Sequence, residues 1–190
     1  MQRIMIENQQ FEKIDYTQQP RLLEQFECCT FVGCTFTNVD ISNSEFTECE
    51  FRNCNLSMVT VKNTAFKEVR FVNCKILGVN FGQCSEFLLQ WYFEDCILNN
   101  TSFHKLNIKN TLFKNCSIQE ADFTETNAQS VAFDNCDLLN TSFDFTNLEK
   151  ADFRTAYNYA LDPETNKIAK AKFSLQGVVG LLYKYNISIT

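Results

Sequence analysis

The sequence predicts an all-β solenoid, a quadrilateral β-helix of about seven coils that ends in a C-terminal capping helix. Three observations predict this fold class. Apolar residues recur at every fifth position through most of the 190 residues, smaller residues recur two positions before them, and cysteines recur at every twentieth position. Neither the helix period of 3.6 residues nor the strand period of 2 produces a spacing of five, so the chain is predicted to be a repeat protein.

The five-residue period runs in two phases. Every fifth residue from Phe26 to Phe81 is apolar, and after a slip of two positions every fifth residue from Phe93 to Phe153 is apolar as well. Among the 19 phenylalanines, only Phe87 and Phe145 lie off both phases. The other three positions of each five are mostly polar, which predicts that they form the surface and that the central and smaller residues point inward.

The spacing of twenty indicates that four pentapeptides form one coil. One face then collects a column of phenylalanines whose rings can stack: Phe31, Phe51, Phe71, Phe93, Phe113, Phe133 and Phe153. An inward column of small residues holds Cys34, Cys54, Cys74, Cys96, Cys116 and Cys136. A corner column that can hydrogen-bond along the stack holds Asn53, Asn73, Asp95, Asn115 and Asn135. At one strand spacing per coil, the rod is expected to be about 34 Å long.

Three excursions are expected to interrupt a repeat domain over residues 1–173, and they fall at 17–25, 82–92 and 158–166. The excursion at 82–92 carries the two extra residues of the phase slip. It contains the single tryptophan, Trp91, at an inward site. Packing of this large side chain is a sufficient reason for the bulge, and a functional loop is the alternative.

Residues 174–190 are predicted to form a helix and tail that close the last coil. Ser174 can cap a helix whose apolar face holds Leu175, Val178, Val179, Leu182 and Tyr185. Three further apolar residues have no evident partner within one chain: Leu181, Ile187 and Ile189. Such a surplus near a terminus predicts a homodimer interface.

Composition and charge point to a cytoplasmic protein that binds neither nucleic acid directly nor a membrane. The N-terminus lacks the apolar run of a signal peptide, and no window reaches the length of a membrane span. The 10 cysteines are therefore expected to be reduced thiols. The formal net charge of −6 opposes binding to DNA or anionic lipid and favours a basic partner.

No pattern of catalytic, metal or cofactor residues is found, so the chain is predicted not to be an enzyme and to need no cofactor. The cysteines follow the repeat instead of the close spacing that zinc ligands have, so core packing is favoured over metal binding. The single histidine, His104, is at an outward position beside Lys105. A filled solenoid also has no cavity in which a nucleophile and a base could converge.

Acidic side chains are concentrated in the second half of the rod. Residues 81–155 contain 11 acidic and 5 basic residues, a balance of −6. The carboxylates that could form a partner-binding surface there are Glu120, Asp122, Glu125, Asp134, Asp137, Asp144, Glu149 and Asp152. Their ordinary role is solubility, and a basic groove on a partner is the alternative.

The tandem five-residue units resemble the pentapeptide-repeat family. Ala121-Asp122-Phe123-Thr124-Glu125 and Ala151-Asp152-Phe153-Arg154-Thr155 are most similar to its motif, and the resemblance covers residues 26–155. It implies a right-handed β-helix. Through the Qnr-type and MfpA-type members it also implies two rods joined tail to tail by C-terminal helices, which mimic DNA and bind DNA gyrase or topoisomerase IV, with quinolone protection as a consequence.

Two functions follow as hypotheses. The first is a non-catalytic scaffold whose flat faces bind a protein partner that the sequence does not identify. The alternative is an acidic DNA mimic, a stiff rod whose carboxylates replace phosphates in the basic saddle of a type II topoisomerase. The sequence leaves open which face of the rod binds and whether the 82–92 bulge takes part.

Overall fold

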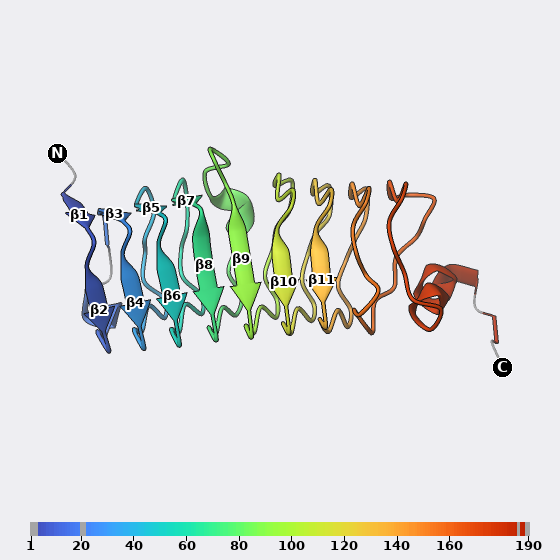
Figure 1. Ribbon diagram of the computed structural model, residues 1–190, viewed down its shortest axis with the longest axis horizontal. Helices are drawn as coiled ribbons and strands as arrows, with labels where there is room; N and C mark the ends of the chain where they lie inside the picture. The colour runs from blue at the N-terminus through green and yellow to red at the C-terminus, as the bar shows by residue number, and fades with distance from the viewer. Residues whose placement is uncertain (1–3, 20–21, 186, 189–190) are drawn as a thin grey trace.

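The computed structural model describes residues 4–19, 22–185, 187 and 188, which form one elongated stack of coils (Figure 1). The strands are three or four residues long and lie on two walls of the rod. The first sheet holds, in spatial order, β1 (Met5–Glu7), β3 (Gln25–Glu27), β5 (Glu45–Thr47) and β7 (Ala65–Lys67). The second holds β2 (Gln10–Glu12), β4 (Thr30–Val32), β6 (Glu50–Arg52), β8 (Val69–Val72), β9 (Trp91–Glu94), β10 (Leu112–Lys114) and β11 (Ala132–Asp134).

All strand pairs within these two sheets are parallel, and their register follows the repeat. Phe51 pairs with Phe71, Phe71 with Phe93, and Phe93 with Phe113. The offsets are therefore 20, 22 and 20 residues, so four pentapeptides form a coil and the two extra residues are absorbed between β8 and β9. The prediction of an all-β parallel solenoid is confirmed.

The number of coils differs from the predicted seven. The seven strands of the longer sheet make six steps, so the regular stack has about six turns. It begins one coil before Phe31, since Phe11 of β2 pairs with Phe31. Beyond β11 the wall continues only as the isolated bridges Ala132↔Asp152 and Asp152↔Lys172, because turns there interrupt the extended backbone.

The corners of the rod depend on residues that tolerate a left-handed backbone. Asn53, Asn73 and Asn115 have φ angles of 54°, 52° and 53°, in the region where asparagine is favoured among residues with a Cβ. Their side chains form a ladder from coil to coil. The Asn73 amide donates to Asn53 Oδ1 at 2.6 Å, and the Asn115 amide donates to Asp95 Oδ1 at 3.0 Å. The predicted corner column therefore stabilises the stack along its axis.

The core is filled by stacked phenylalanine rings. The Phe93 and Phe113 ring centroids lie 5.0 Å apart with the planes 2° from parallel. Phe113 also meets Phe103 of a neighbouring column edge to face, at 5.9 Å and 81°. Both arrangements are favourable geometries for aromatic pairs. All seven phenylalanines of the predicted column are buried.

The smaller inward residues do more than fill space. The Thr64 hydroxyl donates to the Ile41 carbonyl at 2.8 Å, and the Thr126 hydroxyl donates to the Phe103 carbonyl at 2.7 Å. The Cys54 thiol lies 3.3 Å from the Phe31 carbonyl in the equivalent position. Threonine and cysteine can thus play the same part there, because each presents a compact donor to the preceding coil in these three cases.

The excursion at 82–92 begins within a short 3-10 helix, η2 (Phe81–Gln83), and continues as a loop that projects from the rod. Trp91 is buried at its base, against Phe81 and Phe93. The tip carries Phe87 and Leu88, which are 66% and 65% exposed. In the 17–25 excursion the 3-10 helix η1 (Tyr16–Gln18) is capped by the Asp15 carboxylate, which accepts the Thr17 N–H at 2.9 Å.

The predicted C-terminal capping helix is wrong for the described residues. The segment forms two 3-10 helices, η3 (Gly177–Leu181) and η4 (Tyr183–Tyr185). The face predicted to close the last coil is exposed, and its members are Leu175, Val178, Val179, Leu182 and Tyr185. No helix in the described part of the chain is long and apolar enough to cross a bilayer.

Two glycines explain this change. A Cβ at Gly177 would lie 2.1 Å from the Tyr159 hydroxyl, and a Cβ at Gly180 would lie 2.2 Å from the Tyr159 carbonyl oxygen. The segment therefore approaches Tyr159 more closely than a side-chain-bearing helix could. Glycine also disfavours an α-helix by about 1 kcal/mol per residue. The tighter turn places Leu181, and not the predicted face, against the core.

Candidate functional site

The outward side of the second sheet carries two columns of side chains, here called the β8–β11 wall. The first column follows the strand register and the bridge beyond it, and it holds Arg70, Tyr92, Leu112, Ala132 and Asp152. The second column, two residues further along each strand, holds Val72, Glu94, Lys114 and Asp134, with Arg154 beyond it. Neighbours in a column are one strand spacing apart, about 4.8 Å, so their side chains touch.

Charges at the β8–β9 end of this wall are paired. The Lys114 ammonium lies 2.8 Å from Glu94 Oε1, and the Tyr92 hydroxyl donates to Glu94 Oε2 at 2.8 Å. These hydrogen bonds lower the pKa of Glu94. The Arg70 guanidinium lies 4.4 Å from the centre of the Tyr92 ring, a cation–π contact. This end of the wall is therefore polar and internally satisfied.

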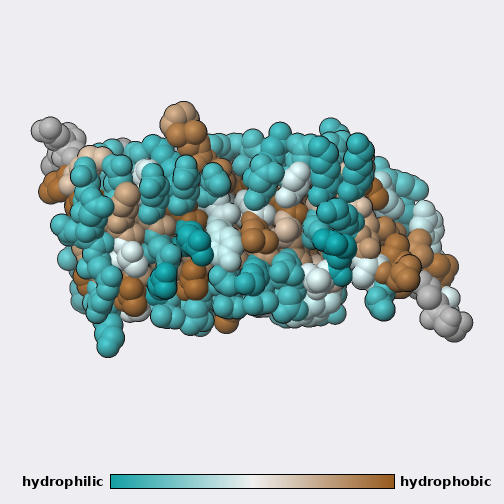
Figure 2. Space-filling model, in the orientation of Figure 1, coloured by the Kyte–Doolittle hydropathy of each residue, from teal (hydrophilic) through white to brown (hydrophobic). Residues whose placement is uncertain are grey.

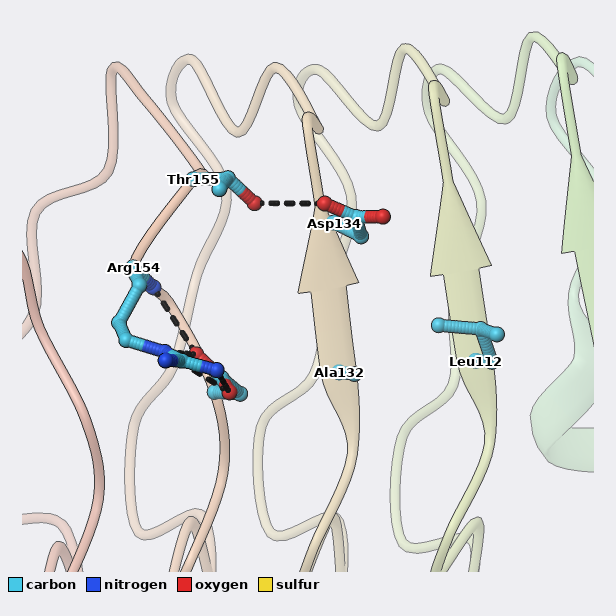
Figure 3. Close-up of a pocket in the computed structure, with 6 residues that line it drawn as sticks. Leu112, Ala132, Asp134, Arg154 and Thr155 are labelled. Atoms are coloured by element: carbon cyan, nitrogen blue, oxygen red, sulfur yellow. Dashed lines mark hydrogen bonds and ion pairs between the residues drawn. The ribbon is translucent and has the colours of Figure 1, made fainter.

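The wall is hollowed between β10 and the residues after β11 (Figure 3). The hollow has a volume of about 420 Å³, and its lining is formed by Leu112, Ala132, Asp134, Asp152, Arg154 and Thr155. It exists because Ala132 lies in the column between two longer side chains, Leu112 and Asp152. Leu112 and Ala132 thus form an apolar floor, and the polar residues form a rim.

Asp152 on the rim is ion-paired with two cations, Arg154 and, at 3.6 Å, Lys172. Arg154 Nη2 lies 2.7 Å from Asp152 Oδ2, and Arg154 Nε lies 2.9 Å from Asp152 Oδ1, which is a bidentate geometry. This pair lowers the pKa of Asp152. Asp134 instead accepts a hydrogen bond from the Thr155 hydroxyl at 2.9 Å. Figure 3 shows Arg154 turned away from Asp134, although the two follow each other along one column.

The eight carboxylates of the predicted acidic surface do not form one patch. Asp134 and Asp152 are brought together by the hollow. The others lie on different walls or corners, and most are hydrogen-bonded to neighbours one coil away. Glu120 accepts from Asn100, Asp122 from Ser102, Asp137 from Asn158, and Glu149 from Gln129, while Glu125 is ion-paired with Lys105 and Asp144 is exposed.

The three residues of the predicted dimer interface have different positions. Leu181 packs against the core, so the expectation that it lacks a partner within the chain is wrong. Ile187 is exposed and lines a C-terminal hollow of about 380 Å³ together with Val179 and Tyr183. Ile189 lies outside the described residues. An exposed apolar surface is thus present at this end, and it combines the predicted Ile187 with Val179 and Tyr183, which were not predicted to belong to it.

The inward cysteines are buried free thiols. Nine of the cysteines are buried, including all six of the predicted column, and Cys28 is exposed. Burial raises the pKa of Cys49 to about 12 and that of Cys84 to about 12, which keeps both as thiols at neutral pH. Within the described residues, no group of three or more His, Cys, Asp or Glu side chains is placed to hold a metal ion.

Sequence reasoning missed both the hollow and the apolar loop tip. The signal for the hollow was present, since Tyr92, Leu112 and Ala132 are apolar residues twenty apart at outward, normally polar positions. The signal for the tip was the off-phase Phe87. Figure 2 shows the loop before β9 as an apolar tip that projects from a largely polar outline. Both features are suited to contacts with another macromolecule.

Comparison with known proteins finds two family models and several solved structures that are similar to this chain. A model of the pentapeptide repeat region matches residues 88–157, and a model of eight pentapeptide repeats matches residues 25–57. No curated protein matches the sequence significantly. Two trypsin-treated variants of QnrB1, a plasmid-mediated fluoroquinolone resistance protein, have similar structures, with TM-scores of 0.73 and 0.64 at 16% identity. The matches cover 98% and 99% of this chain and 92% and 98% of those chains.

Proposed function

The chain belongs to the pentapeptide-repeat family, and from this premise we propose that it is a non-catalytic scaffold that binds a protein partner on the β8–β11 wall. The observation that carries the proposal is the hollow of Leu112, Ala132, Asp134 and Asp152. An apolar floor with a polar rim is the pattern of protein-interaction surfaces. The cytoplasm is the proposed location, because reduced thiols persist there.

The test compares three immobilised baits against extract of the cells that produce the protein. The wild-type bait is expected to retain one protein saturably, and an Ala132→Trp bait, whose hollow is filled, is expected to lose it. The matched control is Asn107→Trp on another wall, which should retain the partner. If no protein binds the wild type saturably, the scaffold proposal fails. If both tryptophan variants retain it, the partner binds elsewhere on the rod.

A second candidate is an acidic DNA mimic that binds DNA gyrase or topoisomerase IV. Two observations favour it: the fold similarity to QnrB1 and the balance of −6 over residues 81–155. The distribution of carboxylates over several walls argues for the scaffold instead, because a duplex presents its phosphates in continuous rows. Most of the predicted carboxylates are also engaged with neighbours in the rod.

Dimerisation through the C-terminal end would double the rod and is part of the mimic hypothesis. We propose that Val179, Tyr183 and Ile187 form this contact, because they are exposed around one hollow. Val179→Glu with Ile187→Glu is expected to yield monomers in sedimentation experiments. Supercoiling by purified gyrase should then be inhibited by the wild type and not by the double variant. Absence of inhibition or quinolone protection by the wild type at any salt concentration would exclude the mimic for gyrase.

A further inference from the structure

Asp134 is the carboxylate of the β8–β11 wall that is left without a cation. In its column, Glu94 pairs with Lys114, which lies one coil further along the rod. The residue one coil beyond Asp134 is Arg154, so the same rule would pair these two. Arg154 pairs with Asp152 instead. Among the described residues, no ammonium or guanidinium group lies within ion-pair distance of Asp134, and its Oδ1 accepts only from a neutral donor, the Thr155 hydroxyl. One negative charge at the rim is therefore uncompensated.

The apolar floor lies beside this carboxylate. Leu112 and Ala132 line the hollow with Asp134, so apolar and anionic surfaces meet in one depression. Asp152 in the lining is ion-paired with both Arg154 and Lys172, so Asp134 is the carboxylate of the lining that has no ion-pair partner among the described residues. A ligand that complements both features has an aliphatic stem that can lie on the floor and one positive charge at its end.

We propose that the hollow binds an arginine side chain of the partner protein, with its methylene stem on Leu112 and Ala132 and its guanidinium against Asp134. Arginine fits better than lysine because a guanidinium is more weakly hydrated than an ammonium and presents several donors to a carboxylate. Arginine is also enriched, and lysine depleted, in protein interfaces. The inference rests on the proposed function, because it specifies what the scaffold recognises.

The test uses a defined probe, the peptide acetyl-Gly-Ser-Arg-Ser-Gly-amide, titrated into the isotope-labelled protein. Shifts of the Leu112 and Ala132 methyl signals are expected to report weak, saturable binding. The same peptide with citrulline in place of arginine keeps the shape and loses the charge, and is expected to bind at least fivefold more weakly. The lysine peptide should lie between the two.

Three variants locate the site. Asp134→Asn keeps an acceptor for Thr155 and removes the charge, and it is expected to raise the Kd of the arginine peptide at least fivefold. Ala132→Leu fills the floor without a change of charge and should have a similar effect. Asp144→Asn removes an exposed carboxylate beyond the Asp122↔Ser142 bridge, on a different wall, and should change the Kd less than twofold. Unchanged spectra away from the hollow show that each variant is folded.

Equal binding of the arginine and citrulline peptides, or an unchanged Kd for Asp134→Asn, overturns the inference. Shifts that map to another wall overturn it as well. Its failure is distinguishable from that of the scaffold. A partner lost from the Ala132→Trp bait, together with arginine peptides that do not bind, leaves the scaffold standing and rejects the arginine. If the arginine peptide binds and no protein partner is retained saturably, the arginine site stands and the scaffold proposal is rejected.

Discussion

At the smaller inward position, some residues contribute a hydrogen bond as well as a compact side chain. Threonine hydroxyls and cysteine thiols there donate to a carbonyl of the preceding coil, as Thr126 does to Phe103 and Cys136 does to Phe113. Burial raises the pKa of Cys49 and Cys84 at this position, so both stay protonated and unreactive at neutral pH. Cys28 differs, because it lies at a corner with φ of 51° and is exposed.

Cys28 is expected to be the first thiol to react with a maleimide in the native protein. Partial loss of hydration and the Glu48 carboxylate raise its pKa, and its Sγ lies 3.7 Å from Glu48 Oε2. Since the thiolate is the nucleophile, Glu48→Gln should lower the pKa of Cys28 and increase its labelling rate at pH 8. Mass spectrometry of timed samples measures this. Labelling of Cys49 at a similar native rate would contradict the burial of the inward cysteines.

Phe87 and Phe145 are the phenylalanines off the repeat, and both are exposed. Phe87→Ser is expected to change the free energy of unfolding by less than about 0.5 kcal/mol, because the ring loses little buried area. Phe123→Ala is the matched core variant and should cost about 3–5 kcal/mol. Urea denaturation of the two variants gives the comparison, and a large loss for Phe87→Ser would show that the loop tip packs on the rod.

At the scale of elements, the C-terminal segment is held to the last turn by polar contacts. The Lys184 ammonium lies 2.8 Å from Asp162 and 2.7 Å from Glu164, and the Leu161 N–H donates to the Gly180 carbonyl at 3.1 Å. With Tyr159 beneath the two glycines, these contacts replace the apolar helix face that the sequence predicted. The stability of this segment's attachment to the last turn should therefore depend on pH.

The hydrogen bond from Lys184 lowers the pKa of Asp162. A carboxyl with a lowered folded pKa stabilises the fold above its unfolded value, about 3.9, and this contribution is lost as the pH falls through the folded pKa. The protection factor of the Leu161 amide is therefore expected to fall below about pH 4. Lys184→Met should lower it already at pH 6, whereas Lys170→Met, at an exposed lysine, should not. Equal protection at pH 6 in wild type and Lys184→Met would show that the ion pair does not hold the segment.

The sequence predicted the periodic elements well and the non-periodic ones poorly. A spacing of five fixes the inward residue in every coil, so Phe113 and Cys116 could be placed from the repeat alone. The C-terminal segment has no repeat, and its shape depends on the approach of Gly177 and Gly180 to Tyr159, a contact between residues that no local pattern links. The unpaired carboxylate at the hollow likewise depends on which of two nearby carboxylates forms the ion pair with Arg154, and only the three-dimensional arrangement determines this.

At the scale of the molecule, stability is a sum over neighbouring coils. Each coil contacts the one before and the one after, through ladder hydrogen bonds and stacked rings. A solenoid of this kind behaves as a one-dimensional array, in which a defect weakens the two interfaces beside it. The position of a mutation along the rod should therefore matter as much as its chemistry.

Phe113→Ala and Phe173→Ala test this dependence on position. Phe113 is fully buried between Phe93 at 5.0 Å and Phe133 at 5.3 Å, whereas Phe173 is half-buried and stacks on Phe153 at 5.4 Å. The central variant opens a cavity between two coils and is expected to cost about 3–5 kcal/mol. The terminal variant removes one stacked neighbour at the edge of the array and should cost clearly less.

The two variants should also differ in how the rod unfolds. A central cavity separates the array into two halves, so denaturation of Phe113→Ala should broaden or split into two transitions, whereas Phe173→Ala should leave one transition and loosen only the last coils. Lys114→Ala is the matched surface control beside Phe113, and loss of its ion pair with Glu94 should cost at most about 1 kcal/mol. Hydrogen exchange across the rod, read with urea denaturation, distinguishes these outcomes. Equal losses at positions 113 and 173 would mean that the coils unfold as a single unit, and that the stack transmits a local defect along its whole length.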